Sequence, residues 1–134
     1  MRTVIVGCGR VGSNLARWLG EEGDDVTVID FNEQAFNRLG EDFPGEMVFG
    51  TGVDEDVLRR AGTEHADAFV AVTNTDSTNI MAAQLARYHF GVKQVICRLY
   101  DPARESIYAE LGLQTICATT LSAEAIKHFF EADR

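Results

Sequence analysis

A short β-branched run that opens directly into a glycine turn constrains this chain more than any other feature. Residues 2–6 are apolar after Arg2, and they are followed by Gly-Cys-Gly-Arg-Val-Gly, the pattern GxGxxG. Between a strand and a helix, Gly7 permits the tight turn, Gly9 lets a pyrophosphate approach the backbone, and Gly12 lets the helix pack close to the sheet. The unpaired N–H groups at the start of that helix favour an anion. These residues therefore predict a phosphate-binding turn.

The next predicted strand ends in a carboxylate. Residues 26–30 read Val-Thr-Val-Ile-Asp, and Asp30 is placed to accept both hydroxyls of an adenosine ribose. The 2′-phosphate of NADP(H) would meet this carboxylate with no arginine between the two anions, so we expect NAD(H) or a plain adenine nucleotide. The alternative is a domain that has kept the turn and lost the ligand.

Strand and helix patterns alternate along the whole chain. Further strands are predicted over residues 46–50, 66–73, 93–99 and 113–117. Helices are predicted after the glycine turn, over 32–43, 54–61, from 75 or 76 to 88, from 102, and over about 120–132. We therefore expect an α/β fold, a Rossmann-like doubly wound parallel six-stranded sheet in the order 3-2-1-4-5-6 with helices on both faces.

Apolar stripes indicate which side of each helix faces the sheet. The expected inward residues are Val11, Leu15, Trp18 and Leu19 in the first helix, Phe36, Leu39 and Phe43 in the second, and Ile80, Met81, Leu85 and Tyr88 after the fourth strand. In the predicted strand order the first and fourth strands are neighbours, and a ligand binds above their carboxyl ends. The glycine turn would line one side of that crevice and residues 73–76 the other.

Length and charge exclude several functions. The chain has 134 residues, enough for the single domain 1–134 that we expect and too few for a complete dehydrogenase with its substrate domain. Its net charge of −9 gives no support to binding the phosphate backbone of a nucleic acid. No signal peptide occurs and no apolar run approaches about 18 residues, so we expect no membrane insertion.

Cysteines and histidines give no sign of a metal site. Cys8, Cys97 and Cys117 lack CxxC spacing, which indicates free thiols in a reducing cytoplasm. The three histidines are scattered without ligand partners at useful spacing. Cys8 sits where a helix N-terminus could stabilise a thiolate, but a small residue that fills the turn is the favoured interpretation.

The middle of the chain carries a resemblance to a known family. The segments that carry it are residues 50–54 (Gly-Thr-Gly-Val-Asp), Leu58, Ala61-Gly62, residues 66–73, Thr78-Asn79, Arg98, Asp101-Pro102 and Leu111-Gly112. In this order they resemble the TrkA-N family, also called the RCK or KTN nucleotide-binding domain. The resemblance covers essentially the whole chain and is more specific than the glycine motif alone.

The resemblance implies a set of cofactor-binding residues and no catalytic or metal-binding ones. It implies phosphate contacts in the glycine turn, ribose contacts at Asp30, adenine contacts near the third strand, and further contacts across the crevice. The set is Gly7, Cys8, Gly9, Arg10, Val11, Gly12, Asp30, Phe31, Thr51, Gly52, Val53, Thr73, Asn74 and Arg98. A solvated loop residue at Arg10 and a structural ion pair at Arg98 are the alternatives.

The resemblance also implies a function. Family members resemble regulatory gates that bind NAD(H), ATP or ADP, with AMP in the same class, and control a potassium transporter or channel without consuming the ligand. It implies no enzyme activity and a cytoplasmic domain, peripheral on the inner face of the membrane through a potassium-translocating subunit. It further implies a homodimer or a ring of dimers, in which the helix at about 120–132 crosses to the partner.

The chain departs from the family pattern in two ways, and two other functions remain as alternatives. Thr51 stands where the family usually has an acid, which affects the adenine contact. The C-terminal subdomain of the family is absent, so the chain is part of a longer gene product or a minimal member. The main alternative function is an NAD-dependent oxidoreductase cofactor domain that lacks its substrate domain, but no histidine, lysine or tyrosine falls in the segments expected at the crevice. A nonbinding interaction module is the third.

Overall fold

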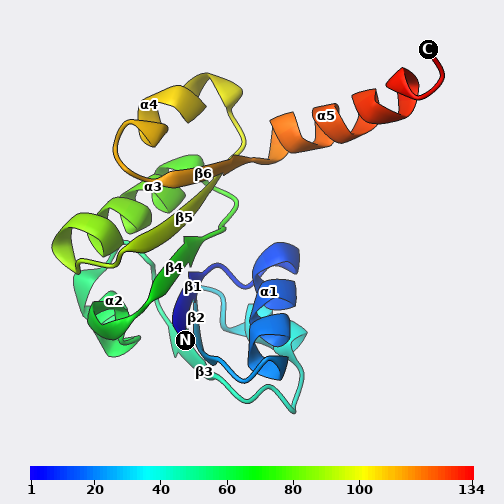
Figure 1. Cartoon of the computed structure of the whole chain (residues 1–134). Coiled ribbons are helices and arrows are strands. Elements are labelled where there is room, and N and C mark those ends of the chain that lie inside the picture. Colours follow the sequence, from blue (N-terminus) through cyan, green and yellow to red (C-terminus); the bar gives the residue numbers. More distant parts are fainter.

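The computed structural model describes all residues from 1 to 134 as one parallel sheet with helices on both faces (Figure 1). The strands are β1 (Arg2–Val6), β2 (Asp25–Asp30), β3 (Glu46–Phe49), β4 (Ala68–Ala71), β5 (Gln94–Leu99) and β6 (Gln114–Cys117). Their order is β3-β2-β1-β4-β5-β6, and every neighbouring pair is parallel. The predicted doubly wound sheet and its strand order are confirmed.

The helices connect successive strands. The α-helices are α1 (Arg10–Glu21), α2 (Glu55–Arg60), α3 (Asp76–Gln84), α4 (Glu105–Ala109) and α5 (Ala118–Glu131). Three 3₁₀ segments are η1 (Glu33–Leu39), η2 (Thr63–His65) and η4 (Pro102–Arg104), and a π-helical segment, η3 (Leu85–His89), continues α3. No helix combines the length and the apolar character that a membrane crossing requires.

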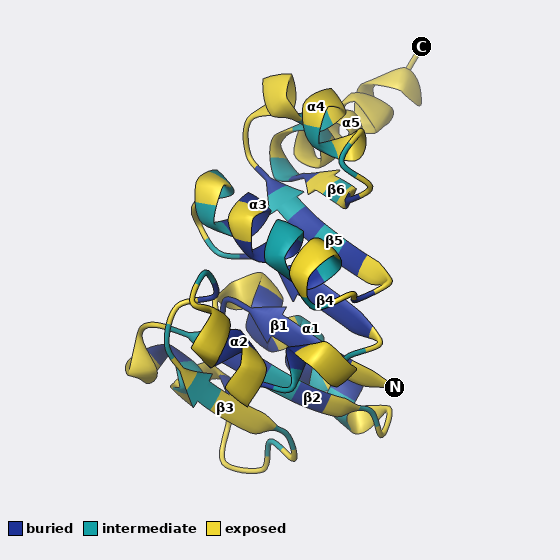
Figure 2. Cartoon of the chain, turned by 90° about the vertical axis from the view of Figure 1, so that its left-hand side faces the viewer, coloured by how far each residue is buried: buried dark blue, intermediate teal, exposed yellow.

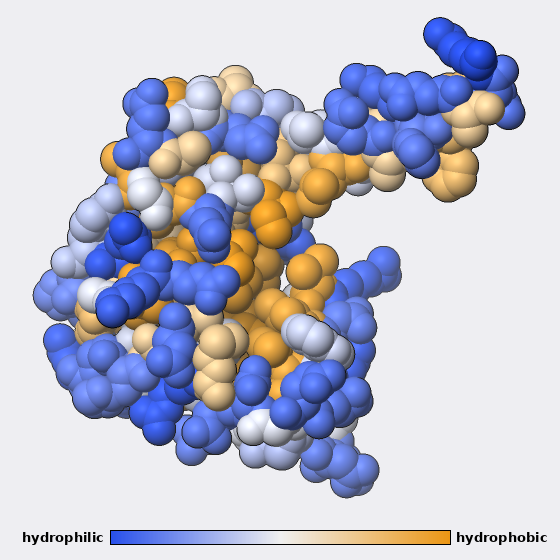
Figure 3. All heavy atoms as spheres, viewed as in Figure 1, coloured by the Kyte–Doolittle hydropathy of each residue, from blue (hydrophilic) through white to orange (hydrophobic).

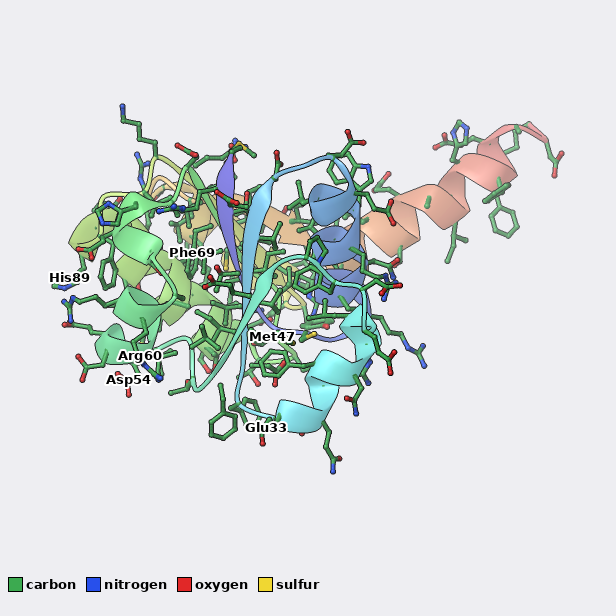
Figure 4. The ribbon with its side chains drawn as sticks, turned by 90° about the horizontal axis from the view of Figure 1, so that it is seen from below. Glu33, Met47, Asp54, Arg60, Phe69 and His89 are labelled. Carbon is green, nitrogen blue, oxygen red and sulfur yellow. The ribbon has the colours of Figure 1, made fainter.

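Two hydrophobic clusters lie on the two faces of the sheet because the side chains of a strand alternate. Val4 and Val6 of β1 belong to the cluster under α2 and α3, whereas Ile5 belongs to the cluster under α1 and η1. The central strand β4 is buried at every residue, as a parallel strand covered on both sides should be. In Figure 4, Glu33 at the start of η1 lies on one side of this sheet, and Asp54 and Arg60 at the two ends of α2 lie on the other.

The predicted helix over residues 32–43 is shorter than expected. Asn32 caps the 3₁₀ segment η1 by accepting a hydrogen bond from the backbone N–H of Gln34 at 3.1 Å. The segment ends before Gly40, whose φ of +83° leaves the helical region. Pro44 follows shortly afterwards and cannot continue a helix. The η1 segment therefore covers only a short part of the sheet edge formed by β2 and β3.

Two of the predicted inward stripes are partly wrong. In α1 the buried residues are Gly12, Ser13, Ala16 and Leu19, while Val11 and Trp18 are exposed. The helix packs so close to the sheet that small residues face it. In the helix that follows β4, Met81 and Tyr88 are exposed as well. At Tyr88 the reason is the π-helical segment, which places an extra residue in the turn after Gln84 and so shifts the phase of the apolar pattern. Met81 precedes this segment and lies on the exposed side of α3.

Helix α5 leaves the body of the domain at its first turn (Figures 1 and 2). None of its residues is buried. It occupies the predicted position, about residues 120–132, and begins two residues earlier. Helix α5 does not cover the sheet, and hydrophobic residues gather in the recess between the base of α5 and α1 (Figure 3).

Candidate functional site

A hollow of about 330 Å³ opens at the carboxyl ends of the central strands. It lies where the strand order reverses between β1 and β4, the position at which open α/β sheets bind their ligands. Its lining comes from the segments that follow β1, β2, β3 and β4, which the parallel sheet brings to one edge. The lining residues are Val6, Gly7, Cys8, Gly9, Ile29, Asp30, Phe31, Asn32, Ala35, Arg38, Gly50, Thr51, Gly52, Val72, Thr73, Asn74, Thr75 and Thr78.

The three glycines of the turn have different roles. Gly7 has a φ of +111°, and a Cβ atom there would lie 2.8 Å from the carbonyl oxygen of Val72. A Cβ atom at Gly12 would overlap the carbonyl oxygen of Gly7. A Cβ atom at Gly9 would meet no atom within 4 Å. Gly7 and Gly12 are therefore required by the fold itself, whereas the missing side chain of Gly9 leaves open space at the N-terminus of α1.

The carboxylate of Asp30 holds the glycine turn in place. Its Oδ2 accepts a hydrogen bond from the backbone N–H of Cys8 at 2.7 Å, and its Oδ1 accepts one from the N–H of Asn32 at 2.8 Å. Each carboxylate oxygen has a second lone pair for a further donor. Asp30 therefore ties β1 to β2 and still keeps acceptor capacity at the wall of the hollow.

Cys8 contributes its backbone to the hollow and its side chain to the core. The thiol is fully buried, and its Sγ donates to the carbonyl oxygen of Ala35 at 3.3 Å. Burial, with the charge of Asp30 adding to it, raises the pKa of Cys8 to about 11. The thiol is therefore neutral at physiological pH, in agreement with the interpretation of Cys8 as a small residue that fills the turn.

Arg38 is a wall residue that the sequence analysis missed. Its Nη1 donates to the carbonyl oxygen of Cys8 at 3.4 Å, and the residue lines the hollow together with Asp30. The expectation that a 2′-phosphate would meet Asp30 with no arginine between the two anions did not take Arg38 into account. Ala35 and Arg38 are three residues apart and share one side of the 3₁₀ segment, a geometry that the apolar spacing of residues 32–43 does not reveal.

The opposite wall is stabilised by the fully buried amide of Asn79. Its Oδ1 accepts from the N–H and the hydroxyl of Thr73 at 2.8 and 2.6 Å. Its Nδ2 donates to the carbonyl oxygens of Thr73 and Arg98, both at 3.0 Å. Asn79 therefore joins the loop after β4 to the neighbouring strand β5 and fixes the position of the Thr73 hydroxyl.

The guanidinium of Arg98 binds the backbone that follows β4. Its Nη2 donates to the carbonyl oxygens of Val72 and Thr73 at 2.8 and 2.9 Å, and its Cζ lies 5.1 Å from the ring centroid of Tyr100. Arg98 is not among the residues that line the hollow. In this structure it supports the wall from behind, and it forms no ion pair with an acid.

The structure brings most of the candidate residues to the hollow. Those that line it are Gly7, Cys8, Gly9, Asp30, Phe31, Thr51, Gly52, Thr73 and Asn74. Those that do not are Arg10, Val11, Gly12, Val53 and Arg98. Arg10 and Val11 begin α1 and are exposed beside the turn. The hollow also includes residues outside the candidate set, namely Val6, Ile29, Asn32, Ala35, Arg38, Gly50, Val72, Thr75 and Thr78.

A second hollow, of about 320 Å³, lies at the amino ends of the strands and is lined by polar side chains such as Arg2, Asp24 and Arg60. It faces away from the glycine turn. Ligands of open α/β sheets bind at the carboxyl ends of the strands, so the first hollow is the candidate site.

The order of the sheet and the glycine-lined hollow at its switch point define a domain of the Rossmann class. Residues 3–119 match the TrkA-N domain family, and the chain belongs to that family. The chain is 48% identical over 124 residues to the Trk system potassium uptake protein TrkA of Streptomyces coelicolor, which covers 92% of this chain and 56% of that protein. It is 36% identical over 111 residues to a TrkA homolog of Pyrococcus abyssi, which covers 83% and 49%. The chain thus spans about half the length of these relatives.

Solved structures share the fold. The TrkA-N domain of the inner membrane protein ybaL from Escherichia coli superposes with a TM-score of 0.85 at 21% identity, covering 96% of this chain and 95% of that one. The GsuK channel bound to NAD gives 0.71 at 19% identity, covering 86% and 21%. The AMP-bound Kef C-terminal domain of Shewanella denitrificans gives 0.73 at 19% identity, covering 99% and 93%.

Proposed function

We propose that this chain is the nucleotide-sensing domain of a cytoplasmic regulator of potassium transport, and that it binds NAD(H) or an adenine nucleotide in the hollow at the switch point. Membership of the TrkA-N family and the potassium uptake relatives support the assignment. A related channel was solved with NAD and a related domain with AMP, which supports the ligand class. The observation that carries the proposal is the open space at Gly9, directly at the N-terminus of α1.

The residues of the hollow suit the parts of such a ligand. The backbone N–H groups at the start of α1 have no helical partners and favour phosphate. The free lone pairs of Asp30 would accept ribose hydroxyls. Thr51 and Gly52 would border the base, and Thr73 and Asn74 would contact the ligand from the opposite wall. Arg10, exposed beside the turn, would reach a terminal phosphate.

The lining is suited to binding and not to turnover. No histidine, lysine or tyrosine lines the hollow, so a bound nicotinamide would find no side chain of the usual proton-donor types. This counts against the oxidoreductase alternative. We expect the nucleotide to act by favouring one of two conformations and to leave unchanged.

We also propose that the domain pairs with a second copy of itself and serves a potassium-translocating membrane subunit. The apolar side chains of α5 lie outside the body of the domain: Leu121 and Ile126 are each 58% exposed, Phe129 is 76% exposed and Phe130 is 62% exposed. A helix with this apolar stripe and no buried residue is suited to a partner surface.

Replacement of Gly9 by Ala tests the site. The added methyl group meets open space in the free protein, so the thermal midpoint without ligand should stay close to that of wild type, whereas Gly12→Ala should lower it. In wild type, NAD⁺, ATP, ADP or AMP at about 100 times its dissociation constant should stabilise the fold by about 2.7 kcal/mol. In Gly9→Ala this stabilisation should disappear, because the methyl group occupies the path of the phosphates. A wild-type protein that no nucleotide stabilises, or equal stabilisation of both proteins, would contradict the proposal.

A further inference from the structure

Two oppositely charged side chains, Asp30 and Arg38, line the end of the hollow that the proposed function gives to the adenosine ribose. Asp30 accepts the N–H of Cys8 at 2.7 Å, and Arg38 donates to the carbonyl oxygen of the same residue at 3.4 Å. Both side chains therefore bind Cys8 from the same wall, and both line the hollow. Their charges act on Cys8 in opposite directions: the carboxylate of Asp30 raises the pKa of the thiol, and Arg38 lowers it.

The two groups differ in how much of their bonding capacity is used. Each oxygen of Asp30 already accepts one backbone N–H. Arg38 has five N–H donors, and the bond to Cys8 uses one of them. Arg38 makes no ion pair. Most of its guanidinium is therefore available to a ligand.

A second arginine, Arg17, lies next to Arg38 but does not line the hollow. Nη1 of Arg17, on α1, donates to the backbone carbonyl oxygen of Arg38. Its guanidinium also lowers the pKa of Cys8, as that of Arg38 does. The ribose end of the hollow is thus lined by one carboxylate and one guanidinium, those of Asp30 and Arg38, and the guanidinium of Arg17 lies next to this lining without being part of it.

From this arrangement we infer that Arg38 is a specificity-determining residue. Its guanidinium attracts a phosphate on the 2′-position of the ribose, whereas the carboxylate of Asp30 repels that phosphate. The inference rests on the proposed function. A guanidinium presents paired donors in a plane that matches a phosphate. The carboxylate of Asp30 accepts hydroxyls and repels the same phosphate. The ratio of the affinities for NAD⁺ and NADP⁺ then depends on the balance between the repulsion from Asp30 and the attraction to Arg38. Neutralisation of Asp30 should reverse the preference.

Dissociation constants of NAD⁺ and NADP⁺, measured by titration calorimetry, test the inference in wild type, Asp30→Asn, Arg38→Gln and the double variant. Asp30→Asn keeps an oxygen for the N–H of Cys8 and removes the charge. We expect wild type to favour NAD⁺ and Asp30→Asn to favour NADP⁺. In both backgrounds Arg38→Gln should reduce NADP⁺ affinity relative to NAD⁺ affinity by about tenfold, in the range of one charge-assisted hydrogen bond.

Arg60→Gln is the matched control. Arg60 lines the second hollow, at the amino ends of the strands, and its replacement makes the same change in net charge. Both affinities should therefore stay at their wild-type values.

The outcomes separate the inference from the proposed function. If no nucleotide binds wild type, the proposed function fails. If nucleotides bind and Arg38→Gln leaves the NAD⁺ to NADP⁺ ratio unchanged, or lowers both affinities equally, Arg38 only supports the turn at Cys8 and the inference fails. Should Asp30→Asn not fold, the Arg38→Gln variant alone decides, by the ratio of its affinities for ADP and for adenosine 2′,5′-bisphosphate.

Discussion

Cys8 shows how much a single residue of the turn is constrained. Its N–H is bound by Asp30, its carbonyl oxygen by Arg38 and its thiol by the carbonyl oxygen of Ala35. Three contacts on one residue join β1 to β2 and η1, so the turn is shaped before any ligand arrives. Preorganisation of this kind lowers the entropic cost of binding.

The buried thiols predict a loss of stability in alkali. The pKa of Cys8 is raised to about 11 and that of Cys97 to about 12, in both cases chiefly by burial. An unfolded thiol loses its proton near pH 8.5, so above this pH the unfolded state binds fewer protons than the folded state. Between about pH 9 and 11 the free energy of unfolding should therefore fall by at most about 1.4 kcal/mol per pH unit for each thiol, because the unfolded thiol has lost its proton and the folded one has kept it.

Urea unfolding at pH 8 and pH 10 measures this slope. The variant Cys8→Ser with Cys97→Ala removes both thiols, so its stability should fall less between the two pH values than that of wild type. Equal falls in the two proteins would show that the thiols do not carry the effect.

The N-terminus of α3 connects the hollow to the last helix. Asp76 accepts the N–H groups of Tyr100 and Asp101 at 2.8 and 3.1 Å. The hydroxyl of Thr119, at the start of α5, donates to the carbonyl oxygen of Tyr100 at 2.7 Å. The loop after β5 is therefore fixed from both sides, by the helix that borders the hollow and by the helix that leaves the domain.

Asp76→Ala should lower the free energy of unfolding by about 1 to 3 kcal/mol, because two backbone donors lose a charged acceptor. Asp56→Ala is the control: Asp56 also lies in the first turn of a helix, but its exposed side chain pairs only with Arg59, at 3.4 Å. Its replacement should cost about 0.5 kcal/mol, in the range of a surface substitution. Equal losses in the two variants, measured by urea unfolding, would mean that Asp76 acts only through the helix dipole.

The alternation of strands and helices was enough to predict the sheet, because a parallel order and right-handed connections leave few arrangements. The glycine turn and Asp30 likewise located the hollow. What the pattern could not give was the phase of side chains after a local irregularity. Tyr88 turns outward within the π-helical segment, and Arg38 faces the hollow because η1 is a short 3₁₀ segment. Both depend on backbone geometry that apolar spacing does not encode.

The molecule as a whole is a compact sheet with one projecting arm (Figure 1). Light scattering at micromolar concentration should report a mass of at least two chains, because a partner would cover the apolar side of α5. Phe129→Asp with Phe130→Asp should reduce the mass to one chain without unfolding the domain, since neither ring is buried in it.

Glu124→Gln with Lys127→Gln provides the control for that measurement. These two residues form an exposed ion pair at 3.5 Å on the same helix, and their replacement should leave the mass unchanged. A wild-type mass of one chain would contradict the proposed pairing.

The attachment of α5 at its base has a mechanical consequence. The helix has 14 residues, which corresponds to a length of about 21 Å. The far end of the helix contacts nothing in this chain, so α5 can rotate as a rigid rod about its base, where Thr119 contacts Tyr100. A rotation of about 10° at the base would displace the tip of the helix by about 4 Å, given the rise of an α-helix. A small rotation at the base of α5 would thus move the tip of the helix by about the size of a side chain.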